Sequence, residues 1–130
     1  GFLFADSICA QQEFAESFRG EIKALFSDAK LVRIPTTHPL MTTEFRGFDI
    51  ANVTLRDPQA RGGNDPLLAR QVQTAPLLEG VEIDGRWAVI FSPYDLSCAL
   101  ENHASLDCKG YLKADAAKIA VNVLLYALQQ

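Results

Sequence analysis

The strongest local constraint on the fold is the segment 81–91, "VEIDGRWAVIF". Two β-rich runs flank the pair Asp84-Gly85, a dipeptide that favours the type I′ turn of a β-hairpin. The second run, 87–91, is apolar on both faces, as expected of a central strand covered on both sides. We therefore expect residues 80–83 to pair with 87–91 as a hairpin inside the main sheet.

Two further apolar runs, residues 2–5 and 31–34, predict short strands. Between them, residues 11–26 carry apolar side chains at helical spacing and predict an amphipathic helix. A strand, a helix and a strand with short joints favour parallel pairing with a right-handed crossover. A last helix is expected over 114–128, with Asp115 near its N-terminus.

These elements predict one three-layer α/β domain, residues 1–130, with a mostly parallel sheet. A chain of 130 residues that is 48% apolar has the length and composition for one hydrophobic core. The side chains expected in that core are Phe14, Phe18, Ile22, Trp87, Val89, Ile119, Val123 and Leu124.

The middle of the chain, residues 36–76, is rich in breaking signals. Its prolines and the segment "RGGND" interrupt any long element, and only 48–55 looks like a strand. A structureless stretch of this length is unusual in a compact domain. We expect either a long irregular functional loop or a flap with partial structure of its own.

Charge and hydropathy exclude several partners. With a net charge of -4 and a pI near 5.1, the chain lacks the positive electrostatic potential that binds a polyanion, so no nucleic acid is expected as a partner. The longest strongly apolar stretch, 119–128, is about half of the roughly 20 residues that a bilayer crossing needs. The first residues show no export signal, and no phosphate-binding glycine motif indicates a cofactor.

The three cysteines, Cys9, Cys98 and Cys108, form no C-x-x-C motif for zinc or redox chemistry. A disulfide between Cys98 and Cys108 is one alternative in an oxidising compartment. The favoured interpretation is that all three are ordinary buried thiols.

Polar side chains follow the ends of the predicted parallel strands. Such strands deliver their following loops to one edge of a sheet, where ligands bind. The binding residues expected around one concave surface there are Asp6, Ser7, His38, Ser92, Tyr94 and Asp95. Two carboxylates and an imidazole placed together would favour a cation or a polyhydroxyl ligand over an anion.

Each of these residues also has a structural interpretation. Asp6 and Asp95 are both typical of helix caps and turns. A hydrolase alternative uses Ser92 or Cys98 as nucleophile, with His103 as base. Glu101 or Asp95 would orient that base. The spacing establishes no catalytic arrangement, so no catalytic residue is predicted.

Metal ligation has adequate residues but no supporting pattern. His38, His103, Asp6, Asp95 and Glu101 are chemically competent ligands, yet none of them shows the i, i+4 spacing of a helical zinc site. Cys9 could act as a nucleophile only with a lowered pKa. The sequence therefore predicts no metal site and no cofactor.

Several segments together resemble one bacterial family. They are "GFLFADS", "FAESFRGEIKALF", "HPL", "PLLEGVEIDGRWAVIFSPYDLSCALE", "CKGY" and "DAAKIAVNVLLYAL". Most of the chain is covered, the middle loop excepted, and the pattern is similar to the bacterial family known as domain of unknown function 4159.

This resemblance implies a flavodoxin-like sheet of the class I glutamine amidotransferase type in an envelope-associated protein, periplasmic or membrane-associated. It also implies a strand and a helix before Gly1, so the chain is expected to be truncated and to self-associate through an exposed strand edge. The Gly-x-Cys-x-Gly turn of the amidotransferases is absent. We therefore expect a non-catalytic module that binds a small ligand or a protein partner, with a hydrolase as the alternative.

Overall fold

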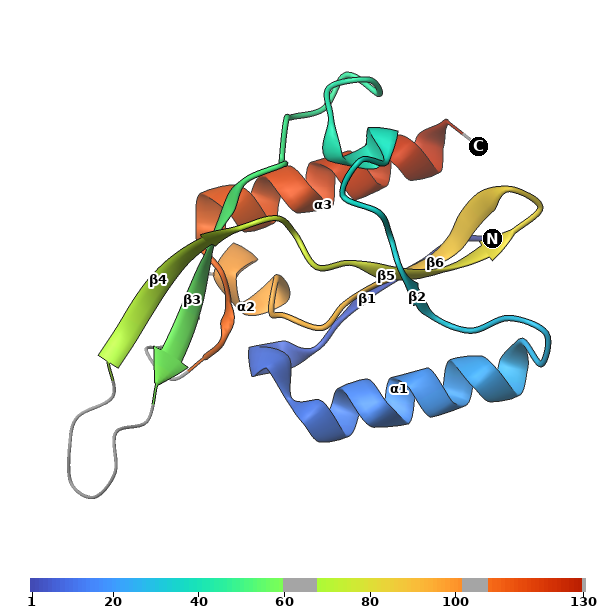
Figure 1. The fold of residues 1–130 in the computed structure, drawn as a ribbon, viewed down its shortest axis with the longest axis horizontal. Coiled ribbons are helices and arrows are strands. Elements are labelled where there is room, and N and C mark those ends of the chain that lie inside the picture. The colour runs from blue at the N-terminus through green and yellow to red at the C-terminus, as the bar shows by residue number, and fades with distance from the viewer. Residues whose placement is uncertain (60–67, 102–107, 130) are drawn as a thin grey trace.

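The computed structural model describes residues 1–59, 68–101 and 108–129, and its fold is α/β with two sheets (Figure 1). A four-stranded sheet has the order β1-β6-β5-β2, and a three-stranded sheet has the order β4-β3-β7. The strands are β1 (Leu3–Asp6), β2 (Val32–Arg33), β3 (Val53–Gln59), β4 (Leu68–Thr74), β5 (Glu79–Ile83), β6 (Arg86–Ser92) and β7 (Gly110–Tyr111). The helices are α1 (Gln12–Leu25), α2 (Ser97–Leu100) and α3 (Lys113–Leu128), with 3₁₀ turns η1 (Ile8–Ala10) and η2 (Pro39–Met41).

The predicted hairpin of β5 and β6 is confirmed. Asp84 and Gly85 have φ angles of 54° and 78°, the left-handed conformations that a type I′ turn requires. Gly80 on β5 lies under the ring of Trp87, where a Cβ atom would come within 2.6 Å of the indole. The absence of a side chain at this position lets the indole pack closely on the neighbouring strand.

The expectation of a mostly parallel, flavodoxin-like sheet is wrong, because most strand pairs are antiparallel. β1 does pair in parallel with β6, with Ala5 opposite Phe91. β2, however, pairs antiparallel with β5 and does not touch β1. The hairpin explains this order, since β6 takes the place beside β1 and β5 takes the next. β2 still runs in the same direction as β1 and β6, so these three strands end at one edge.

The main sheet lies between two helices, with α1 on one face and α3 on the other (Figure 1). Trp87, Ile119 and Val123 belong to the larger core beside α3, and Ile22 and Val89 to the smaller core beside α1. These five predicted core positions are confirmed.

Three predicted core residues lie nearer the surface. Phe14 and Leu124 are 45% and 58% exposed, and Phe18 is only partly buried. Phe14 stacks on Phe18, whose ring stacks on Phe91 at a centroid distance of 4.6 Å. Helical spacing identified the apolar face of each helix but not the limits of the area that the sheet covers.

The middle segment 36–76 contains β3 and β4, which pair antiparallel and continue into β7. The strand expected at 48–55 therefore lies later in the chain. Pro58 is accommodated because β7 pairs only with Leu55 and Arg56, so at Pro58 one side of β3 has no neighbouring strand among the described residues. "RGGND" lies outside the described residues.

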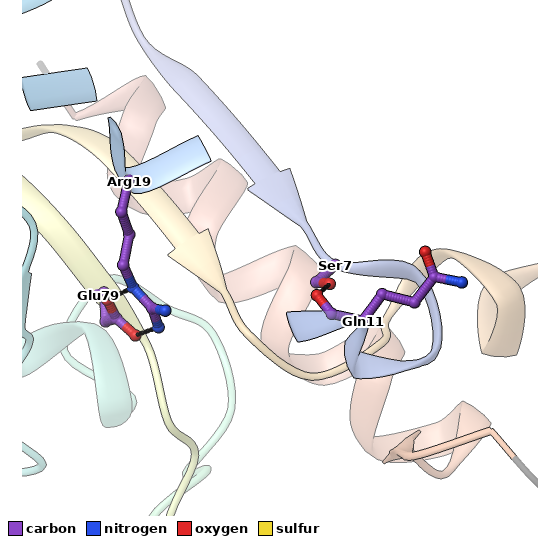
Figure 2. Close-up of polar contacts among 4 residues, drawn as sticks. All are labelled: Ser7, Gln11, Arg19 and Glu79. Carbon is purple, nitrogen blue, oxygen red and sulfur yellow. Dashed lines mark hydrogen bonds and ion pairs between the residues drawn. The ribbon is translucent and has the colours of Figure 1, made fainter. Parts of the chain in front are cut away.

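An ion pair fastens α1 to the sheet. The guanidinium of Arg19 donates to both carboxylate oxygens of Glu79 on β5, at 2.9 and 2.6 Å (Figure 2). The pKa of Arg19 is raised, chiefly by this hydrogen bond to Glu79. Because Arg19 is 40% exposed, the pair contributes about 1 kcal/mol or less.

Across the described residues, no helix has the length and apolar character needed to cross a membrane.

Candidate functional site

Asp6 ends β1 and holds the start of α2. Its Oδ2 accepts hydrogen bonds from the backbone N–H groups of Leu96 and Ser97, both at 2.9 Å, and from the Ser97 hydroxyl at 3.0 Å. Asp6 therefore caps a helix that lies 90 residues away in the sequence. The hydrogen-bond partners of this predicted ligand-binding carboxylate in the described structure are all within the fold.

Asp95 lies at the junction of the two sheets and is 2% exposed. Its Oδ1 accepts from the N–H of Cys98 at 2.9 Å, and its Oδ2 accepts from the N–H of Cys9 at 2.7 Å. Its backbone bridges to Gly110, where a Cβ atom would lie 2.6 Å from the Cβ of Asp95. Asp95 thus joins the loop after β1, helix α2 and strand β7.

The two serines at this edge also have internal partners. Ser7 and Ser92 are fully buried. The Ser7 hydroxyl donates to the carbonyl of Gln11 at 2.8 Å (Figure 2), and the Ser92 hydroxyl donates to the carbonyl of Tyr94 at 2.7 Å. Both hydroxyls shape turns after their strands, so Ser92 has neither exposure nor an adjacent base among the described residues.

The expectation of three unpaired thiols is wrong, since Cys9 and Cys108 form a disulfide with a Cα–Cα distance of 4.4 Å. The alternative pairing of Cys98 with Cys108 is not observed either, and Cys98 is a free thiol. A pairing across 99 positions has no local signal in the sequence. Folding brings the partners together, because one follows β1 and the other precedes β7.

Cys98 is not an activated nucleophile. Its hydrogen bond to Asp95, its burial and the nearby acidic groups raise the pKa of its thiol to about 11. At neutral pH the side chain is therefore almost entirely protonated, whereas nucleophilic attack requires the thiolate.

His38 lies away from Asp6 and Asp95, so the prediction that it shares their surface is wrong. Its ring packs against Trp87 and Tyr126, at centroid distances of 6.2 and 5.7 Å, and its Nδ1 accepts from the N–H of Leu40. Trp87 is near the start of β6, roughly 16 Å along the strand from its end. Burial lowers the pKa of His38, while Glu82 and Glu44 oppose that shift.

The segment around His38 turns back over the sheet because α3 holds it. The buried amide of Asn122 donates to the carbonyls of Leu40 and Phe48 and accepts from the Phe48 N–H. Nothing in the sequence near "HPL" indicates this attachment. Among the other candidates, Glu101 is exposed at the end of α2, and His103 lies outside the described residues.

Beside Asp95, a cavity of about 230 Å³ opens between the two sheets. We call it the cationic groove; its lining residues include Arg33, Asp57, Leu77, Tyr94 and Lys109. The ammonium of Lys109 lies 4.8 Å from the centre of the Tyr94 ring, a cation–π arrangement. Tyr94 is the one predicted binding residue that lines this groove.

Positive charge dominates the groove. Its carboxylate, on Asp57, already contacts Arg70 at 3.2 Å and Lys109 at 3.5 Å. No acidic side chain in the described parts of the chain pairs with Arg33, whose charge lowers the pKa of the neighbouring Tyr111 against a larger raising effect of burial. The expectation of a site for cations is therefore not supported by these charges.

Comparison with protein families gives one match, to the domain of unknown function DUF4159 over residues 1–128. The chain belongs to this family. Searches of curated proteins and of solved structures found no match. In this DUF4159 domain, sequence reasoning missed Arg33 and Lys109. The sequence holds only a weak indication of either residue: Arg33 lies at the end of the predicted strand 31–34, and Lys109 directly follows Cys108.

Proposed function

We propose that this DUF4159 domain is a non-catalytic binding module and that the cationic groove takes an anionic group. The observation that carries the proposal is that Arg33 and Lys109 line one cavity. The carboxylate of this cavity, on Asp57, already contacts Arg70 and Lys109. Tyr94, Leu55 and Leu77 add apolar and aromatic surface beside these charges. A ligand with a carboxylate and a small apolar body fits that combination.

The hydrolase alternative has no support from the described geometry. Ser92 is buried and donates its hydroxyl to a carbonyl, and the pKa of Cys98 is raised. A covalent mechanism needs a nucleophile that an adjacent base activates. Neither residue has a histidine beside it among the described residues.

The groove can be tested with two probes that share an aromatic ring and differ in charge. We expect benzoate, but not benzylammonium, to shift the backbone amide signals of Leu77, Tyr94 and Lys109 in an NMR titration. Replacing both Arg33 and Lys109 by Gln should weaken benzoate binding by about tenfold or more, because two charge-assisted contacts are lost.

Lys23→Gln provides the matched control, since Lys23 lies in the last turn of α1 and is exposed. This variant should bind benzoate like the unmodified chain. Equal shifts with both probes, or unchanged benzoate binding in the Arg33 and Lys109 double variant, would contradict an anion site in the groove.

An envelope location follows as part of the same proposal. The Cys9–Cys108 disulfide supports an oxidising compartment such as the bacterial periplasm, because structural disulfides are rare in the cytosol. Thiol labelling of the protein denatured directly from intact cells, before any reductant is added, should modify Cys98 alone. Free Cys9 and Cys108 in that assay would argue against this location.

Self-association is the remaining part of the proposal. β1 is an edge strand of the four-stranded sheet, and Leu3 on it is 45% exposed. Edge strands with exposed apolar side chains pair with other chains unless charges protect them. We expect sedimentation velocity to show concentration-dependent association that Leu3→Lys abolishes. Leu25→Lys, on the exposed end of α1, should leave it unchanged; a monomer at all concentrations would refute the edge contact.

A further inference from the structure

All three cysteines of the chain converge on the carboxylate of Asp95. Cys9 donates its N–H to this carboxylate, Cys98 bonds to it through both its N–H and its thiol, and the Sγ of Cys108 lies 3.1 Å from Oδ2. The three come from the loop after β1, from α2 and from the segment before β7. A short motif could not place them together.

The spacing of these groups suits a metal ion. One ligand atom from each of Cys9, Asp95 and Cys108 lies within 4.8 Å of the others. With Zn–S and Zn–O bonds of about 2.3 and 2.0 Å, a tetrahedral site needs about 3.8 Å between two sulfurs and about 3.5 Å between sulfur and oxygen. Once the disulfide is reduced, small side-chain movements provide that spacing.

Asp95 is oriented as a ligating carboxylate should be. The N–H groups of Cys9 and Cys98 hold its two oxygens, and with the Cys98 thiol they use three of its roughly four lone pairs, which leaves one for an ion. Hydrogen bonds of this kind fix metal-bound carboxylates in place. The residue is almost fully buried, so little reorganisation is needed on binding.

A place for a fourth ligand adjoins the cluster. A cavity of about 10 Å³ is lined by residues that include Asp95, Cys108 and Arg56, and this volume holds about one water. Two thiolates and a carboxylate leave one negative charge after a divalent ion binds. Arg56 lines the same cavity.

We propose that the chain, when its Cys9–Cys108 disulfide is reduced, binds one Zn²⁺ through the sulfurs of Cys9 and Cys108 and the carboxylate of Asp95. A dithiol reductant supplies two electrons and two protons and itself becomes a disulfide. The two protein thiols then release their protons as the ion binds. Zinc accepts sulfur and oxygen ligands together, whereas softer Cu⁺ favours an all-sulfur set. Disulfide and zinc exclude one another.

Zinc titration of the full chain tests this site. In a phosphine reductant, which is oxidised to its oxide and does not compete for zinc as a thiol would, calorimetry should show one Zn²⁺ per chain. The oxidised chain should bind none there. Asp95→Asn should weaken binding by about 10- to 100-fold, and Cys9→Ser with Cys108→Ser should abolish it.

Cys98→Ser is the matched control, because it removes a thiol that touches Asp95 but supplies no ligand. It should keep both the zinc affinity and the sulfur-to-cobalt absorption of the Co²⁺-loaded chain. No zinc uptake by the reduced chain, or uptake that survives loss of both Cys9 and Cys108, would overturn the site. A cobalt band that weakens in Cys98→Ser would overturn the ligand assignment, and this spectrum decides the matter even if the double serine variant fails to fold.

Discussion

Replacing Cys9 or Cys108 by serine is expected to lower the free energy of unfolding by about 4 kcal/mol under oxidising, metal-free conditions. The disulfide closes a loop of 99 positions and connects the end of β1 to the start of β7. Losing it releases the unfolded chain from that restriction and leaves the two sheets joined by weaker contacts. Urea denaturation followed by circular dichroism measures the difference.

The control for this prediction uses the third cysteine. Cys98→Ser should cost less than about 1 kcal/mol, because serine can still donate to Asp95. Reducing the unmodified chain in the presence of a chelator should reproduce the loss seen in Cys9→Ser. If oxidised Cys9→Ser were as stable as the unmodified chain, the disulfide would not hold the sheets together.

Asp95→Ala is expected to lower the free energy of unfolding by about 3 kcal/mol. The substitution leaves the N–H groups of Cys9 and Cys98 without their acceptor at a position that is 2% exposed. Each buried donor left without a partner costs about 1 to 3 kcal/mol. Thermal and urea unfolding of the purified variant provide the measurement.

Asp6→Ala gives the comparison, because Asp6 caps α2 but lies in a less buried place. A smaller loss of about 1 to 2 kcal/mol is expected there, as for other helix caps. Losses below about 0.5 kcal/mol for both variants would mean that the carboxylates are dispensable for folding. That result would favour the original interpretation, in which both act on a ligand.

Asp6 and Asp95 lie at the edge where the sequence predicts a binding site. Both carboxylates accept hydrogen bonds from backbone N–H groups, so in the disulfide-bonded chain they hold the loops of this edge in place. The positively charged side chains near this edge are those of Arg33 and Lys109, which line the cationic groove. Because Lys109 directly follows Cys108, the disulfide also restrains one wall of the groove.

Local features of the fold could be predicted from the sequence. The Asp84-Gly85 turn, α1 and α3 follow from short-range conformational preference and apolar periodicity, which act within a few residues. The arrival of Asp6 and Asp95 at one edge followed from strand direction, because β1 and β6 are parallel neighbours. The class of the chain as an α/β protein depended on the same local patterns.

Only the tertiary structure decided the strand order, the disulfide and the charge of the groove. β5 lies between β6 and β2 because it forms the hairpin with β6. The positions of β1 and β2 on either side of this hairpin depend on packing between segments far apart in the sequence. His38 lies near Trp87 because Asn122 holds its segment against α3. Cys9 pairs with Cys108, and Arg33 and Lys109 line one cavity, although each pair is far apart in the sequence. Such contacts leave no periodic trace in the sequence, since each depends on long-range packing and not on spacing along the chain.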